Sequence, residues 1–145
     1  MSMMKQKQCG VAIVEFALIL PLLLLLTFIT TEFGRAVYQY NTLTKSVRDA
    51  VRYLSVQAPG TKITEAQNLV VYGNTSGTGS PLVVGLALSN VPTPTWKTEG
   101  TMPVINTVRV SITGYVFRPL VSGAFGVSFS NLTYSDITAT MRAQL

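Results

Sequence analysis

Residues 10–31 read GVAIVEFALILPLLLLLTFITT, and this stretch decides the fold. From Val11 to Thr31 the run is apolar apart from one charge, Glu15. At a rise of about 1.5 Å per residue, the run forms about 30 Å of helix, which matches the hydrocarbon core of a bilayer. It is longer than the apolar core of a signal peptide and ends without a convincing cleavage site. We therefore expect it to be retained as a membrane span.

The composition fits one membrane span followed by one small domain. Hydrophobic residues make up 48% of the 145 residues and charged residues only 12%, which is too apolar for an ordinary soluble domain. The net charge is +5, but no run of lysine and arginine produces it. Binding to nucleic acid is therefore not expected.

An enzymatic function is not expected either. Histidine is absent and Cys9 is the single cysteine, which excludes most metal sites, histidine-dependent catalysis and an internal disulfide. The acidic residues are spread along the chain, and only a meeting of Glu99 with Asp136 would create a carboxylate pair. We expect no catalytic residue, no metal, no cofactor and no small-molecule substrate.

The helix is predicted to continue beyond the membrane. Apolar residues recur there at spacings of three and four, which describe one helical face; they are Phe33, Val37, Tyr40, Leu43, Val47, Val51 and Leu54. Glu32 and Arg35, three residues apart, are expected to pair weakly on the opposite face. Pro59-Gly60 ends the pattern. The prediction is one rod over Val11–Ala58, about 70 Å long.

Pro21 lies inside this rod and removes one backbone hydrogen bond, so a local kink is expected. Membrane helices tolerate proline better than soluble ones. One interpretation is a harmless kink. The other is a weak point that lets the helix bend or melt when subunits pack.

The remainder of the chain is predicted to form a small sheet domain. A short helix is expected within Thr61–Tyr72, capped by Thr61 or Thr64, and a Gly-rich loop follows it. Alternating apolar residues then predict strands; these are Val83–Leu88, Thr107–Phe117 and Leu132–Arg142. In the second strand, Val108, Val110, Ile112 and Val116 share the apolar side. The fold class is therefore α+β, with the amphipathic half of the helix covering an antiparallel sheet.

Aromatic residues in the sheet region leave two interpretations open. Trp96, Tyr115, Phe117 and Tyr134 either form a contact patch for a partner or pack against the rod and the sheet edge. Packing is the favoured interpretation.

Glu15 needs an explanation, because a lone carboxylate in a membrane helix costs about 2.5–3.5 kcal/mol on insertion scales. The rest of the apolar run offers no charged partner. If the chain is cut after Gly10, however, a new amine appears at Val11. That amine, on a neighbouring copy or a related subunit, can pair with Glu15. The alternative is that Glu15 snorkels to the lipid headgroups near the end of the span.

Several of these residues together resemble the TadE-like family of minor pseudopilins, which belongs to the tight-adherence (Flp, type IVb) pilus systems of bacteria. The resemblance is carried by the Gly10-Val11 junction, Glu15-Phe16, Pro21, Glu32-Phe33-Gly34-Arg35, and the segment from Arg48 to Tyr53. It extends over Cys9–Leu54 and is weaker over the sheet. Val11 departs from the Phe that follows the cut in many pilins.

The resemblance implies a type IV pilin-like fold and a specific maturation. A membrane prepilin peptidase would cut between Gly10 and Val11, so that the net charge falls to +3 on loss of Lys5 and Lys7. The implied domains are a leader (1–10), a transmembrane half-helix (11–31), an amphipathic half-helix (32–58) and a C-terminal sheet domain (59–145).

The family also implies location and partners. The protein would be a single-pass protein of the bacterial inner membrane, with a cytoplasmic N-terminus and a periplasmic sheet domain, and would either enter the pilus or stay at its base. Its partners would be the prepilin peptidase, other pilin or pseudopilin subunits, assembly platform proteins and the lipid bilayer. The alternative is an uncleaved single-pass anchor with a small external binding domain.

Overall fold

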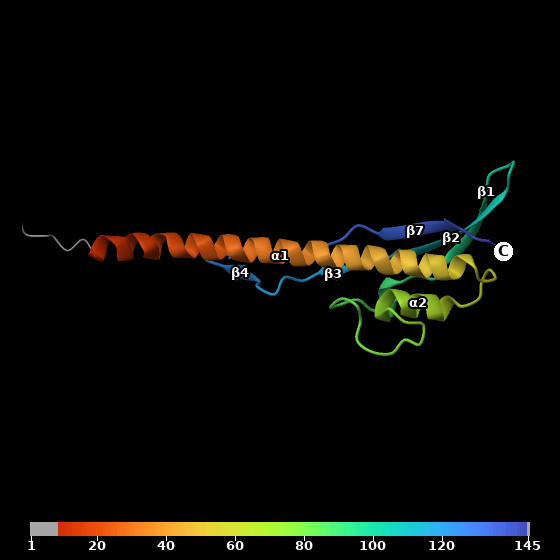
Figure 1. Cartoon of the computed structure of the whole chain (residues 1–145), viewed down its shortest axis with the longest axis horizontal. Coiled ribbons are helices and arrows are strands. Elements are labelled where there is room, and N and C mark those ends of the chain that lie inside the picture. Colours follow the sequence, from red (N-terminus) through yellow and green to blue (C-terminus); the bar gives the residue numbers. More distant parts are fainter. Residues whose placement is uncertain (1–8, 145) are drawn as a thin grey trace, which may run out of the picture. The chain divides into compact units, whose positions relative to one another are not determined.

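The computed structural model describes residues 9–144, so most of the predicted leader, including Lys5 and Lys7, lies outside the described residues. The elements are two α-helices, a short 3-10 helix and seven strands. In order they are α1 (Cys9–Ser55), α2 (Ile63–Tyr72), η1 (Leu88–Asn90), β1 (Thr95–Glu99), β2 (Ile105–Ile112), β3 (Val116–Phe117), β4 (Gly123–Ala124), β5 (Val127–Ser128), β6 (Leu132–Thr133) and β7 (Ile137–Arg142) (Figure 1). A long apolar helix packed on a small antiparallel sheet confirms the α+β, pilin-like prediction.

The described chain divides into two compact units. Unit 1 contains residues 9–35 and 119–130, and unit 2 contains residues 36–118 and 131–144. The helix α1 runs through both of them. It ends at Ser55, three residues before the predicted end, because the residue before Pro59 avoids the helical region and Gly60 takes a positive φ of 78°.

The core of unit 2 lies between the second half of α1, the helix α2 and the sheet. Its fully buried α1 side chains include Leu43, Val47 and Leu54, as the predicted stripe requires. The first part of the predicted stripe is wrong, because Phe33, Val37 and Tyr40 are exposed.

The inner face of α1 begins instead with Glu32, Ala36 and Gln39, which are all at most 9% exposed. The expected Glu32–Arg35 ion pair forms, but Glu32 lies on this buried face rather than on the opposite one. Glu32 and Gln39 are polar and interrupt the apolar pattern of this buried face. Apolar spacing alone therefore predicted a neighbouring face of the helix instead.

The main sheet has the order β1-β2-β7 and is antiparallel throughout. In the central strand β2, Val108, Val110 and Ile112 are buried, as predicted. The alternation then reverses, since Tyr115 and Phe117 are buried while Val116 is only half-buried. Gly114, with a φ of 64°, breaks the strand and turns the next residues over.

Three local predictions in this region are wrong. Val83–Leu88 is a loop that leads into η1, although Val83 and Leu86 are buried. No strand was expected at Thr95–Glu99, but this segment forms the edge strand β1, in register with β2. Neither Thr61 nor Thr64 caps α2; the cap is Lys62 in a left-handed conformation, without a side-chain cap.

Candidate processing and subunit-pairing site

The predicted processing junction lies in the first turn of α1. Gly10 is exposed, and a Cβ built on it meets no heavy atom within 4 Å. Val11 follows and is 71% exposed. The described chain therefore leaves this junction open to an external enzyme, and side chains at position 10 are not restricted by the fold.

Glu15 lies one helical turn beyond Val11, on the same face of α1, since residues four apart are neighbours on a helix. It is exposed and forms no ion pair or hydrogen bond within residues 9–144. A cut at Gly10 would give a helix that starts at Val11, whose first unpaired N–H groups and amine carry positive charge. Glu15 would then lie next to that charge. The pairing itself stays a prediction.

The apolar half of α1 is exposed over most of its circumference. Its large apolar side chains from Val11 to Ile29 are mostly between 39% and 75% exposed. An apolar surface of this extent does not stay in water, and by length and composition α1 is able to cross a membrane. The α-helix continues through Pro21, and the proposed weakness at that residue stays a prediction.

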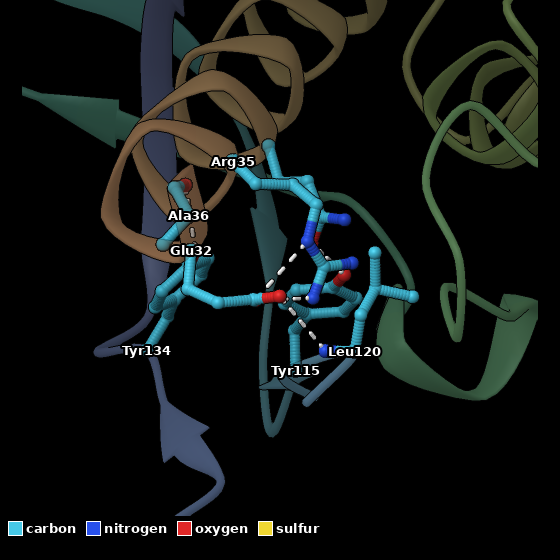
Figure 2. A network of polar contacts seen from close by, with 7 residues as sticks. Glu32, Arg35, Ala36, Tyr115, Leu120 and Tyr134 are labelled. Carbon is cyan, nitrogen blue, oxygen red and sulfur yellow. Dashed lines mark hydrogen bonds and ion pairs between the residues drawn. The ribbon is translucent and has the colours of Figure 1, made fainter. Parts of the chain in front are cut away.

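Glu32 forms a polar contact that sequence reasoning did not identify. Its Oε2 accepts a hydrogen bond from Arg35 Nη2 at 2.8 Å, and its Oε1 accepts one from the backbone N–H of Leu120 at 3.1 Å (Figure 2). Glu32 as a whole is 8% exposed. Because buried charges require such partners, this contact fixes residues 119–130 to the end of the apolar half-helix.

A second set of contacts holds the sheet domain to α1 within unit 2. The Tyr115 hydroxyl donates to Gln39 Oε1 at 2.9 Å. The Tyr134 hydroxyl donates to the Ala36 carbonyl at 2.7 Å (Figure 2). The Tyr134 ring packs against that of Tyr115, with the ring centroids 5.5 Å apart and the ring planes tilted by 41°. The predicted packing role of these aromatics is confirmed, and Trp96 likewise packs against the core.

Glu99 and Asp136, the two carboxylates that could have met, do not lie together in the sheet. Glu99 pairs in register with Ile105, at one end of β2, whereas Asp136 precedes Ile137, which pairs with Ile112 at the other end. The two carboxylates therefore lie at opposite ends of the sheet. No group of three or more metal-ligating side chains is present in residues 9–144.

Comparison with known proteins gives a match over the helix that carries this site. Residues 10–52 match the family model described as TadE-like protein. This part of the chain is TadE-like. No curated protein and no solved structure matches the chain.

The TadE-like match confirms the resemblance seen in the sequence, and it covers both Gly10 and Glu15. It indicates involvement in tight-adherence pilus systems. The TadE-like family is structural rather than enzymatic. With the apolar helix, the match supports a membrane-anchored pilus protein that interacts with other pilus components.

Proposed function

We propose that this chain is a minor pilin or pseudopilin subunit that acts in assembly of a bacterial Flp (type IVb) pilus. Prepilin peptidase cuts it between Gly10 and Val11, and the mature protein begins at Val11. The observation that carries the proposal is the order of Gly10, Val11 and Glu15 at the start of an exposed apolar helix that is TadE-like.

The chemistry of the proposal is charge compensation inside lipid. Glu15 is costly in the membrane while it lacks a partner, at about 2.5–3.5 kcal/mol on insertion scales. Cleavage creates an amine at Val11, which is largely protonated at neutral pH. The mature chain's own terminus lies one turn away and offsets part of this cost.

A neighbouring subunit in the correct register supplies a second amine to Glu15. Glu15 therefore has both amines beside it only in the assembled state. Pairing with the neighbour's amine fixes the register between subunits. The neighbour is another copy or a related pilin-type subunit, guided by the assembly platform.

The proposed topology follows from the same half-helix. Residues 1–10 form the cytoplasmic leader, 11–31 cross the inner membrane, 32–58 form the amphipathic half-helix, and 59–145 form the periplasmic domain. Arg35, Lys45, Arg48 and Arg52 lie soon after the span and compete with the two leader lysines, so orientation rests on the family.

The test is substitution of Gly10 in cells that contain the peptidase. Gly10→Leu is expected to leave the precursor at full length on a gel, because the protease can no longer accept the junction. The matched control is Gly34→Leu, since Gly34 also lies in α1 with no heavy atom within 4 Å of its Cβ position. Normal processing of Gly10→Leu would contradict the proposal, and an uncut wild-type chain would favour an uncleaved single-pass anchor.

A further inference from the structure

Residues 119–130 read PLVSGAFGVSFS and contain no charged residue. They form a β-hairpin in unit 1, in which β4 pairs with β5. The Phe129 N–H closes it by donating to the Ser122 carbonyl at 2.9 Å. The apolar side chains of this hairpin point largely outward, with Leu120 78%, Phe125 59% and Val127 41% exposed.

The tip of the hairpin is unusual for a protein turn in water. Phe125 and Gly126 connect the strands, and both have positive φ values, of 51° and 81°. Two-residue turns of this kind favour Asn, Asp or Gly at the first position, because a bulky side chain is strained there. Phe125 adopts this strained conformation and is 59% exposed, so burial within the described chain does not account for it.

The hairpin lies beside the membrane half of α1. Pro21, Leu25, Phe28 and Glu32 are less exposed than the residues around them, and their spacings of four, three and four place them on one face. Residues 119–130 are the part of unit 1 outside the helix, and Figure 1 draws β4 alongside the orange part of α1. The covered face extends about 16 Å along the helix axis from Glu32 towards the N-terminus.

We propose that the hairpin of residues 119–130 is a second membrane contact, which inserts its tip into the lipid interface around the span. This inference depends on the span of the proposed function but not on processing at Gly10. Lipid is the expected partner of the hairpin's exposed apolar surface, because that surface continues the apolar surface of the span and carries no charge. Its strand edges have unpaired backbone groups, which the hydrocarbon centre does not tolerate. The hairpin therefore lies in the half of the bilayer nearest Glu32, with Phe125 and Val127 towards the acyl chains.

The depth of Phe125 can be measured with an environment-sensitive fluorophore. The full chain with Cys9→Ser is reconstituted in vesicles of phosphatidylethanolamine and phosphatidylglycerol, and Phe125→Cys carries the label. Its emission is expected to shift to shorter wavelength, and a lipid nitroxide near the headgroups is expected to quench it more than one near the chain ends. Leu22→Cys reports the span, and Met102→Cys, at a position 94% exposed in unit 2, reports water.

Each outcome decides between defined alternatives. In the first outcome, the label at position 22 is in lipid, but the label at 125 has the same emission and lipid quenching as the one at 102. This result overturns the inference and leaves the proposed function standing. A label shielded from aqueous iodide but not quenched by lipid nitroxide shows a protein partner or second copy instead, which also overturns it. A label at 22 that is itself in water overturns the span and the proposed function together.

A second variant tests the tip while keeping the hairpin folded. Asn suits a positive φ, so Phe125→Asn preserves the turn and removes the apolar side chain. With the label at Val127→Cys, this substitution is expected to cause a loss of lipid quenching. Val84→Asn, at a position 80% exposed in unit 2, is expected to cause none. Equal quenching with and without Phe125→Asn would overturn the role of the tip.

Discussion

Replacement of Glu32 by Ala is expected to release the segment that begins at Leu120. Glu32 is 8% exposed, and its carboxylate accepts hydrogen bonds from Arg35 and from the Leu120 N–H, at 2.8 and 3.1 Å. Hydrogen bonds to charged groups contribute about 1.5–3 kcal/mol each. Loss of the bond to Leu120 alone, at about 2 kcal/mol, lowers protection of that amide against hydrogen exchange by about 30-fold.

Hydrogen exchange of the full chain in lipid nanodiscs measures this effect directly. The control amide is that of Thr113, which donates to Asn90 at 2.8 Å in unit 2 and is expected to keep its protection. Glu32→Gln is expected to cause a smaller loss at Leu120, because its amide oxygen still accepts the hydrogen bond. Unchanged exchange at Leu120 in Glu32→Ala would refute the assignment of Glu32 as the anchor of residues 119–130.

Glu15→Gln is expected to leave cleavage intact but to reduce co-purification with other pilin-type subunits and piliation; unchanged association would favour snorkelling of Glu15. Leu43→Ala is expected to destabilise unit 2 by about 3 kcal/mol, because Leu43 is fully buried, with a smaller loss for the half-exposed Val37→Ala; denaturant unfolding followed by tryptophan fluorescence measures both. The hydrogen bond from Lys62 lowers the pKa of Glu65, so this pair stabilises α2 above the ordinary carboxyl pKa, and the contribution is lost as the pH falls through the lowered value. An NMR titration of Glu65 with a midpoint at or above 4.5 would contradict that interaction.

The parts of the fold that sequence reasoning predicted are those set by local pattern. The apolar run from Val11, the amphipathic continuation and the α+β class all follow from periodicity within a few turns or one strand. Gly10 and Glu15 were recognisable as a candidate processing and pairing site for the same reason. That prediction depends only on their spacing of five residues and on the apolar residues around them.

The parts that it missed depend on contacts between residues far apart in the chain. Glu32 and Gln39 are able to lie inside because partners 88 and 76 residues away satisfy them. No local signal distinguishes such residues from surface polar ones, although two polar residues spaced by seven on a helix were a usable hint. The edge strand β1 is similar, because its side chains are mostly exposed and its pairing with β2 alone makes it a strand.

The central claim is that proteolysis creates the positive partner of Glu15. Mass spectrometry of the amino terminus of the protein, isolated from a host that assembles the pilus, tests it most directly. We predict a chain that starts at Val11. An intact chain that still begins with Met1 would contradict the account, since Glu15 would then have no new amine to meet.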